Sequence, residues 1–364
     1  MSASRVVILG SGVAGAATAF ALARRGIAVT VVDADLPGRA TDAGAGIIQP
    51  WSVSREGEFY RLYADGAAFY PSFISALAAQ GVSDVGYRRP GALVLSADPA
   101  ELDEVEGRLA ARASDVDADG AEMGEVQRLD QGEARTRFPL LDPTHSALWI
   151  PGGGRVDGRM LRAGLLAAVT SLGGSVRTGR GVLEASGSGI RVSVDGSPLD
   201  ADAIVVACGA WTNEVLAPLE FSVPVEPQKG QIIHFRVDAD TSSWPVAQRT
   251  NSSHYLLAFD GGRIVAGATR EFGSGFDTRA TAFGMQEVLR AALVVAPGLA
   301  NAEVLETRVG LRPLPLAHDQ LPRVSRVDSG GSVPVWVNAG FGAAGLTMGP
   351  LVGDRLAAAI AGAL

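Results

Sequence analysis

The sequence is poor in several residue types that would point to particular classes of protein. It contains a single cysteine, Cys208, so no disulfide can form within the chain, and a reducing compartment suits it. Lysine also occurs only once, at Lys229, and the net charge of −8 argues against a nucleic-acid-binding protein, which would carry a basic face. No apolar run reaches the roughly 18 residues of a membrane helix, and the first residues lack the pattern of a cleaved leader. We therefore expect a cytoplasmic protein with no integral membrane segment and no nucleic-acid partner.

Histidine is also scarce, with four residues in the chain. His145, His234, His254 and His318 show no spacing typical of metal ligands, so we expect no metal site. The chain is nevertheless 364 residues long and 47% hydrophobic, which is ample for the core of a two-domain enzyme. A homo-oligomer is compatible with this composition.

A glycine-rich turn near the start of the chain predicts a dinucleotide site. The turn GSGVAG, residues 10–15, follows a short apolar run and precedes an alanine-rich stretch that favours a helix. The first glycine permits a tight turn, the second lets a pyrophosphate approach the backbone, and the third lets helix and strand pack closely. A second apolar run, residues 27–32, ends at Asp33, which is placed to bind a ribose diol. Strand, helix, strand and acid together predict a βαβ unit.

The residues after this unit favour FAD over a nicotinamide cofactor. A nicotinamide-binding domain would continue with another helix and strand, whereas residues 37–48 read PGRATDAGAGII, a loop of small residues suited to pass close to a flat ring. From this point the sequence resembles the D-amino acid oxidase superfamily of FAD enzymes, in particular its glycine oxidase-like and D-amino acid dehydrogenase-like branch. In that superfamily such a loop lines the pyrophosphate and the isoalloxazine.

Further motifs in the same order extend this resemblance over nearly the whole chain. They are VDGRML at 156–161, Val182, the segment AIVVACGAWT at 203–212, GLRP at 310–313 and the turn GFGAAGLT at 340–347. The resemblance implies an α/β fold, in which a Rossmann-like FAD-binding domain of the glutathione-reductase type is interleaved with an α+β substrate domain built on an antiparallel sheet. We expect the FAD-binding domain to comprise 1–85, 148–217 and 306–364, and the substrate domain to comprise 86–147 and 218–305.

The resemblance also implies which residues hold FAD. Cys208 lies away from the position at which relatives attach flavin through cysteine, so the cofactor should be non-covalent. The expected cofactor-binding residues are Gly10, Gly12, Val13, Ala14, Gly15, Asp33, Ala40, Thr41, Gly44, Ala45, Gly46, Ile47, Val182, Cys208, Gly209, Trp211, Arg312, Gly342, Ala343, Ala344, Gly345, Leu346 and Thr347.

Two residues are candidates for direct contact with a substrate carboxylate. In the family, the arginine of GLRP, here Arg312, holds this group with a planar fork that fits two oxygens; the alternative is a salt bridge between domains. Tyr255 matches a position whose hydroxyl lies near the same carboxylate, or it is a core tyrosine. We also note an aromatic stripe at 59, 63, 69 and 73, which we interpret as packing, and Tyr60, which could face the pocket.

Four further residues are candidates for the wall of the substrate pocket. Arg270 either binds a second acidic group or points into solvent. Trp51 either walls the pocket or caps the core, and Ile48 precedes it in the flavin loop. Phe341 belongs to a turn without charged side chains, so the floor of the pocket should be apolar and small.

The scarcity of candidate bases favours an amine over an alcohol as substrate. An α-ammonium group can lose its proton to solvent, whereas an alcohol needs a positioned base, usually histidine. Only His254 is near a matched residue, and strand alternation turns it away from Tyr255. We expect oxidation of glycine, a D-amino acid or an N-substituted glycine by hydride transfer to flavin N5, giving an imine that hydrolyses, with oxygen or another acceptor reoxidising the flavin. The alternatives are an FAD-dependent 2-hydroxy acid dehydrogenase, a nicotinamide-dependent dehydrogenase and a non-catalytic flavin-binding protein.

Overall fold

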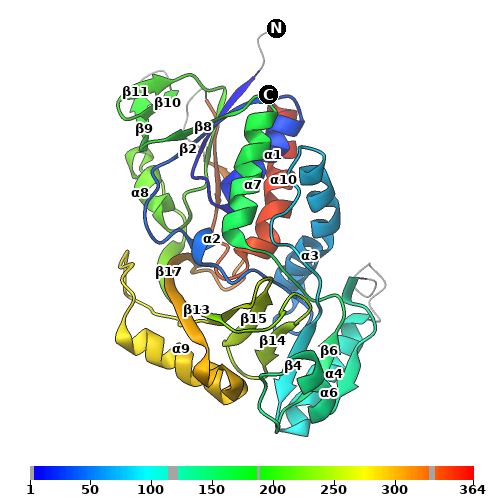
Figure 1. Ribbon diagram of the computed structural model, residues 1–364. Coiled ribbons are helices and arrows are strands. Elements are labelled where there is room, and N and C mark those ends of the chain that lie inside the picture. Colours follow the sequence, from blue (N-terminus) through cyan, green and yellow to red (C-terminus); the bar gives the residue numbers. More distant parts are fainter. Residues whose placement is uncertain (1–3, 114–121, 187–188, 328–332) are drawn as a thin grey trace.

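The computed structural model describes residues 4–113, 122–186, 189–327 and 333–364, and two large sheets organise it (Figure 1). The first sheet has six strands in the order β18-β19-β12-β1-β2-β8, all parallel except the antiparallel pair β18 and β19. Their bounds are β1 (Arg5–Leu9), β2 (Ala28–Asp33), β8 (Ser175–Thr178), β12 (Ala203–Val206), β18 (Arg323–Val327) and β19 (Val335–Ala339). The strand predicted before the glycine turn is thus confirmed.

Alternating side chains of the first sheet pack into two different cores. Val6 and Ile8 of β1 face the helices, whereas Val7 and Leu9 face a small three-stranded sheet on the other side. These layers consist of the helices α1 (Val13–Arg24), α3 (Gly57–Ala78), α7 (Gly158–Ser171) and α10 (Gly345–Ala363), and of the strands β9 (Gly181–Ser186), β10 (Gly189–Val194) and β11 (Ser197–Leu199). Figure 1 shows the four helices side by side in the upper part of the molecule.

Small residues allow the helices of this layer to approach closely. A Cβ atom added to Gly353 of α10 would lie 2.8 Å from the backbone nitrogen of Thr18 in α1. The alanines of α1 are correspondingly buried, among them Ala16 and Ala19, which have no exposed surface. This contact fixes α1 and α10 against each other, and with them their N-terminal ends.

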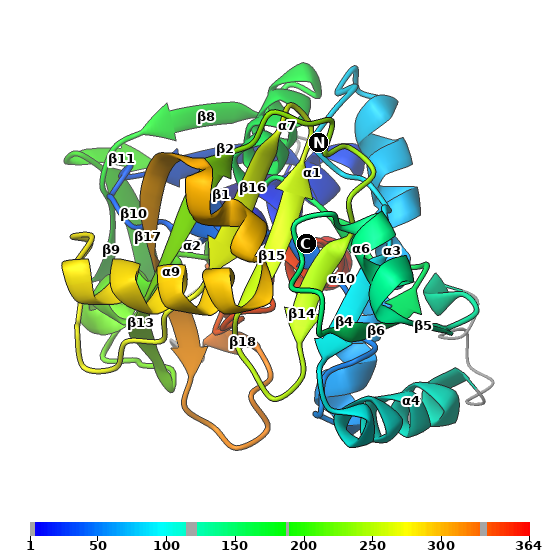
Figure 2. The same cartoon turned by 60° about the horizontal axis from the view of Figure 1, so that its bottom comes forward.

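The second sheet has eight strands in the order β17-β13-β16-β15-β14-β4-β6-β5 and is antiparallel apart from the parallel pair β14 and β4. Its strands are β4 (Ala92–Ser96), β5 (Gln127–Leu129), β6 (Ser146–Ile150), β13 (Val225–Arg236), β14 (Val246–Arg249), β15 (Tyr255–Phe259), β16 (Arg263–Gly267) and β17 (Glu303–Pro315). Helix α9 (Ala282–Val295) crosses one face of this sheet (Figure 2). The α/β architecture of a parallel-sheet unit joined to an antiparallel one confirms the predicted fold class.

Short elements complete the description. A two-stranded sheet pairs β3 with β7, and α4 and α6 cover the end of the large sheet near β4 to β6. The remaining bounds are α2 (Ala40–Ala43), β3 (Ile47–Ile48), α4 (Pro99–Ala113), α6 (Gln131–Arg137), β7 (Gly154–Arg155), α8 (Thr212–Leu216), and the single-turn 3₁₀ segments η1 (Gly209–Trp211), η2 (Ala217–Leu219) and η3 (Pro297–Asn301).

The sequence-based division into domains stays a prediction, and β17 is its most informative test case. Because β17 pairs with β13 along most of its length, residues 306–315 belong to the large antiparallel sheet. They nevertheless reach the glycine-rich loop, where Leu311 donates a backbone hydrogen bond to the carbonyl oxygen of Gly38 at 2.8 Å. This strand therefore connects the two sheets.

The last helix begins before its proline. Proline is typical of the first turn of a helix, but α10 begins at Gly345 and contains Pro350 inside it. Proline has no N–H for the carbonyl of the residue four positions earlier, and this carbonyl, of Leu346, accepts a hydrogen bond from the hydroxyl of Tyr70 instead. A side chain of α3 thus compensates the defect and lets the helix start early.

No helix in the described part of the chain is long and apolar enough to cross a membrane.

Candidate active site

A cavity of about 1440 Å³ extends from the carboxyl ends of β1 and β2 to one face of the large antiparallel sheet. At one end it is lined by Gly10 and Asp33, and at the other by Tyr255 and Arg312. Ligands of α/β folds bind outside the carboxyl ends of parallel strands, so its position agrees with the predicted nucleotide site.

The glycine turn leaves no room for side chains where strand and helix meet. A Cβ atom on Gly10 would lie 2.3 Å from the carbonyl oxygen of Ala207, and one on Gly15 would lie 2.0 Å from the carbonyl oxygen of Gly10. Gly12 differs, because its Cβ atom would meet only the hydroxyl oxygen of Thr41, at 3.4 Å. This is the arrangement expected if Gly10 and Gly15 pack the fold and Gly12 faces a ligand.

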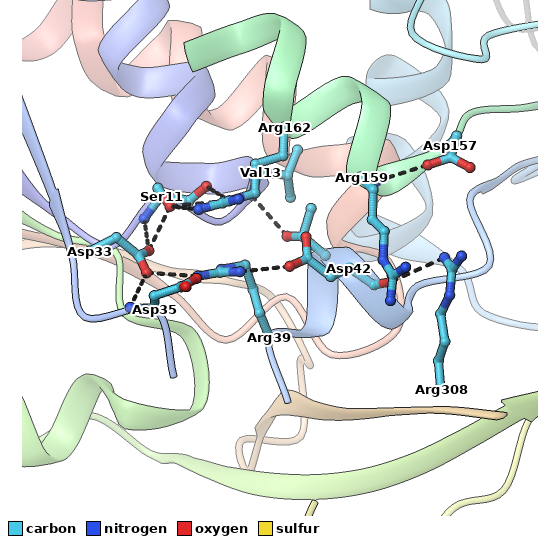
Figure 3. A network of polar contacts seen from close by, with 11 residues as sticks. Ser11, Val13, Asp33, Asp35, Arg39, Asp42, Asp157, Arg159, Arg162 and Arg308 are labelled. Atoms are coloured by element: carbon cyan, nitrogen blue, oxygen red, sulfur yellow. Dashed lines mark hydrogen bonds and ion pairs between the residues drawn. The ribbon is translucent and has the colours of Figure 1, made fainter. Parts of the chain in front are cut away.

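Asp33 anchors a polar network at the adenosine end of the predicted site (Figure 3). One carboxylate oxygen accepts hydrogen bonds from the backbone nitrogen and the hydroxyl of Ser11, both at 2.6 Å. The other accepts from the backbone nitrogen of Asp35 at 2.8 Å and from the guanidinium of Arg39 at 2.7 Å. Burial opposes the charge of Asp33, but these hydrogen bonds and Arg39 outweigh it and lower the pKa of the carboxyl group.

Two helix N-termini face the cavity and suit an anionic group. Helix α1 begins after Gly12 and α10 begins after Ala344, and neither residue provides a side-chain cap. The free N–H groups and the dipole of a helix N-terminus favour phosphate and other anions. The backbone nitrogen of Val13 is bound by the hydroxyl of Thr41 at 2.9 Å, which ties the flavin loop to the first turn of α1.

Most of the residues predicted to bind FAD lie around this cavity, so the residues present fit an extended dinucleotide. Those lining it are Gly10, Gly12, Val13, Ala14, Asp33, Ala40, Thr41, Gly44, Ala45, Gly46, Ile47, Val182, Cys208, Gly209, Trp211, Arg312, Gly342, Ala343, Ala344, Gly345 and Leu346. The role of each toward the cofactor stays a prediction.

Four predicted site residues lie behind the wall of the cavity. Gly15 packs against the glycine turn, and the hydroxyl of Thr347 donates to the carbonyl oxygen of Ile47 at 2.9 Å. Ile48 is 2% exposed and belongs to the helix-side core, because adjacent strand residues point to opposite sides and Ile47 takes the cavity side. Trp51, also 2% exposed, caps the core beneath the large sheet rather than walling the pocket.

Arg312 is held at the cavity face of the large sheet by neutral acceptors. Its guanidinium donates to the carbonyl oxygen of Thr269 at 3.0 Å and to the side-chain oxygen of Gln228 at 3.3 Å. No carboxylate in the described part of the chain forms an ion pair with it, and burial lowers its pKa. Burial also raises the pKa of the nearby Tyr255 to about 12, against the opposing effect of Arg312, so this phenol stays a neutral hydrogen-bond donor.

The sequence did not identify every residue that lines the cavity. Arg55, Phe59 and Tyr63 lie there together with Arg270 and Phe341, which were predicted. The aromatic stripe of α3 was interpreted as packing, yet its first two members face the cavity. Tyr60 does not face it but packs under the guanidinium of Arg112, 3.8 Å from the ring centroid. Helical spacing identified the stripe, but not which neighbours it meets.

The histidines and the cysteine lie where no acid–base or covalent role is evident. None of His145, His234, His254 and His318 lines the cavity. His254 is turned toward α9, with Nε2 3.7 Å from Glu287. Burial raises the pKa of Cys208 to about 12, and its thiol donates to the carbonyl oxygen of Leu9. Within the described residues, no cluster of histidine, cysteine and acidic side chains could hold a metal ion.

Comparison with known proteins places this chain among flavoenzymes. Residues 5–359 match the model of the FAD dependent oxidoreductase family (DAO). The chain is 44% identical to the uncharacterized oxidoreductase YurR of Bacillus subtilis, covering 98% of this chain and 94% of the relative. It is 30% identical to a glycine oxidase of Pseudomonas putida, with 95% and 91% covered.

Solved structures give the same result. The iminodiacetate oxidase of Chelativorans sp. BNC1 superposes with a TM-score of 0.93 at 46% identity, covering 98% of this chain and 95% of that one. The glycine oxidase of Geobacillus kaustophilus superposes with a TM-score of 0.82 at 28% identity, with 96% and 93% covered. Together with the glycine turn and the cavity at the strand ends, these matches show that the chain is an enzyme and belongs to the FAD-dependent oxidoreductase (DAO) family.

Proposed function

We propose that this enzyme oxidises the carbon between a secondary amine and a carboxylate, as in an N-substituted glycine whose N-substituent carries a second carboxylate. The observation that supports this most is the charge of the pocket. Arg312 and Arg270 both line the cavity, and neither forms an ion pair with a carboxylate of the described residues. Glu271 acts on Arg312 without forming an ion pair with it, so both cations remain available to a substrate with two negative charges.

Arg312 is suited to bind the carboxylate next to the reacting carbon. A partly buried guanidinium whose hydrogen-bond acceptors are all neutral keeps a desolvation penalty that an incoming carboxylate offsets. Its planar fork can bind both oxygens, with the Tyr255 hydroxyl as an additional donor. The guanidinium of Arg312 has room in this position because Gly230 lies next to it. A Cβ atom added to Gly230 would be 2.5 Å from both terminal nitrogens.

Arg270 is suited to bind the second carboxylate. Its side chain is exposed to the cavity and has no hydrogen-bonding partner among the described residues, while its charge lowers the pKa of Arg312. An anion between the two side chains would relieve this repulsion. The name of the 46% identical iminodiacetate oxidase, which acts on an amine with two carboxylates, supports the same substrate class for this chain.

The amine is favoured over a 2-hydroxy acid because no base is placed to deprotonate an alcohol. No histidine lines the cavity, and Tyr255 keeps its proton. A secondary amine needs no such base once it has lost its proton to solvent, since its lone pair then assists removal of hydride from the neighbouring carbon. FAD, when bound, accepts this hydride.

The residues of this chain then have three tasks. Arg312 and Tyr255 fix one carboxylate and Arg270 the other, so the carbon between them is held in one orientation. Phe341 and the small residues after it provide an apolar surface that excludes water from the amine. The resulting imine takes up water after release from these contacts and divides into a primary amine and a 2-oxo acid.

The test is anaerobic reduction of the bound flavin by a panel of amines. The loss of flavin absorbance measures the rate of reduction. We expect iminodiacetate to reduce the flavin faster than sarcosine, glycine, D-alanine and L-alanine, and 2-hydroxy acids to leave it oxidised. Faster reduction by a monocarboxylic amino acid, or by glycolate, would contradict the proposal. Turnover with oxygen and with a quinone in parallel identifies the acceptor.

A further inference from the structure

Arg55 also lines this cavity and has no role in the site described so far. Its guanidinium packs over the ring of Phe59, 4.6 Å from the centroid, and its charge faces that of Arg270. No carboxylate of the described residues forms an ion pair with it. Two like charges in one cavity, both without a counterion, indicate a place for an anion between them.

The backbone that carries Arg55 is fixed by α4. Arg112, which is 7% exposed, donates to the carbonyl oxygens of Trp51 and Arg55, the latter at 2.8 Å. Arg108 donates to the carbonyl oxygen of Ser52 at 3.0 Å. Three carbonyl groups in five residues are thus bound by two arginines of one helix. This arrangement presents Arg55 from a fixed position rather than from a free loop.

Arg270 adjoins Arg312, because the guanidinium of Arg312 donates to the carbonyl oxygen of Thr269, the residue before Arg270, at 3.0 Å. Arg55 comes from a different segment, directly before α3, and its carbonyl oxygen is held by Arg112 of α4. Burial is the main cause of the lowered pKa of Arg312 and of Arg55, and the charge of Arg270 contributes to both. The cavity thus has a cationic side chain on a second segment, in addition to the pair beside the large sheet.

Two acidic residues that line the cavity, Glu101 and Glu104, do not neutralise Arg55. The carboxylate of Glu101 is bound by Ser96 at 2.6 Å and by Asn251 at 3.0 Å. Glu104 pairs with Arg108 at 2.8 Å. Both acids line the cavity, yet each is occupied by a neighbour other than Arg55.

We propose that Arg55 is the outer carboxylate-binding residue of the pocket and extends its specificity to diacids with a longer N-substituent. A short second arm, as in iminodiacetate, ends at Arg270, whereas a longer arm passes Arg270 and ends at Arg55 over Phe59. This rests on the proposed function, since it takes Arg312 as the site of the first carboxylate. It makes Arg55 a specificity-determining residue.

The experiment compares Arg55→Met with Arg270→Met and with the control Arg61→Met. Methionine keeps an apolar side chain over Phe59 but removes the charge. Arg61 is an exposed arginine of the same helix region that does not line the cavity. Substrates are iminodiacetate, N-(carboxymethyl)-β-alanine and N-(carboxymethyl)-4-aminobutyrate, with KM and kcat measured separately on the FAD-loaded enzyme. Losing one charge-assisted contact should raise KM about tenfold.

The expected result is a pattern across the substrates. Arg55→Met should raise KM mainly for the longest amine, Arg270→Met mainly for iminodiacetate, and Arg61→Met for neither. Arg55→Lys should recover part of the affinity for the longest amine. An equal effect of Arg55→Met on all three substrates, or an effect no larger than that of Arg61→Met, would overturn the proposal.

A second measurement separates this proposal from the proposed function. Malonate, succinate, glutarate and adipate cannot be oxidised as amines, and their binding is followed by the change in the flavin absorption spectrum. If no amine reduced the flavin, the proposed function would be wrong. The role of Arg55 would still be supported if Arg55→Met bound adipate more weakly while its binding of the three shorter diacids was unchanged. Unchanged adipate binding in that variant would overturn it.

Discussion

The hydroxyl of Tyr70 donates a hydrogen bond to the carbonyl oxygen of Leu346, the group that Pro350 leaves without a helical partner. Tyr70 is completely buried in α3, and burial raises the pKa of its hydroxyl well above the usual value, so it remains a donor. Because Leu346 lines the cavity, this bond also supports the first turn of α10 where it faces the predicted flavin site.

Tyr70→Phe should therefore destabilise the protein by about 1–3 kcal/mol, the cost of leaving a buried carbonyl without a donor. Chemical denaturation of the purified protein measures the difference. Tyr87→Phe is the matched control, since Tyr87 stacks on Tyr70 with ring centroids 5.1 Å apart while its hydroxyl forms no hydrogen bond with the described residues. Equal losses in both variants would mean that the hydrogen bond of Tyr70 adds nothing beyond the removal of a buried hydroxyl.

A buried histidine makes stability depend on pH. His234 is 1% exposed, and burial together with Arg308 and Arg263 lowers its pKa from 6.5 to about 3. Below pH 6.5 the unfolded chain binds a proton at this residue that the folded protein does not bind. As the pH is lowered below 6.5, the free energy of unfolding should therefore decrease, by up to about 1.4 kcal/mol per pH unit.

Substitution of His234 by leucine should reduce this slope between pH 6.5 and 5. Denaturation curves at several pH values give the slope for each variant. His318→Leu serves as the control because His318 is exposed. An unchanged slope in His234→Leu would show that His234 does not stay neutral in the folded protein.

Asp33 is predicted to bind the ribose of FAD, although protein donors already surround its carboxylate. Asp33→Ala should weaken FAD binding by about 1–3 kcal/mol, on the scale of a hydrogen bond to a charged group. Titration of the apoprotein with FAD measures this, and acid precipitation should release all flavin into the supernatant. Unchanged affinity for FAD would show that the Asp33 carboxylate binds only protein groups, those of Ser11, Asp35 and Arg39.

Gly230 should be needed for the position of Arg312. Its replacement by alanine brings a Cβ atom to 2.5 Å from the guanidinium nitrogens, and the flexible arginine moves rather than the backbone. We expect a loss in kcat/KM of about tenfold or more, because small displacements of a positioning group are costly. FAD content should stay unchanged. Gly107→Ala, at a glycine with open space around it, should retain full activity.

The sequence predicted those parts of the fold and the site that a local motif specifies. The βαβ unit was recognised because glycines, apolar runs and a terminal acid must all occur at fixed spacing, and Tyr255 and Arg312 were identified through motifs of a known family. In the structure, Tyr255 begins the strand Tyr255–Phe259. Alternation along it also predicted that His254 points away from Tyr255.

What escaped prediction depends on contacts between distant segments. In α10, which starts ahead of Pro350, the unpaired carbonyl of Leu346 is bound by Tyr70, which lies 276 positions away in the sequence. Arg55 belongs to no motif in the sequence, and Tyr63 belongs to the stripe interpreted as packing, yet both line the cavity in the folded protein. Trp51 looked equally suited to pocket and core, and side-chain burial decided for the core.

The central claim is that Arg312 binds the carboxylate of the substrate, and Arg312→Lys tests it most directly. Lysine keeps the charge but loses the planar fork, so the reacting carbon would be held less precisely. With iminodiacetate as substrate we predict a loss in kcat/KM of at least about tenfold, roughly 1.4 kcal/mol of transition-state binding, and a larger loss for Arg312→Ala. Oxidation of an amine without a carboxylate should be nearly unaffected, with FAD content and thermal stability unchanged. Equal losses for both kinds of amine, or loss of FAD, would contradict the account and make Arg312 a structural residue.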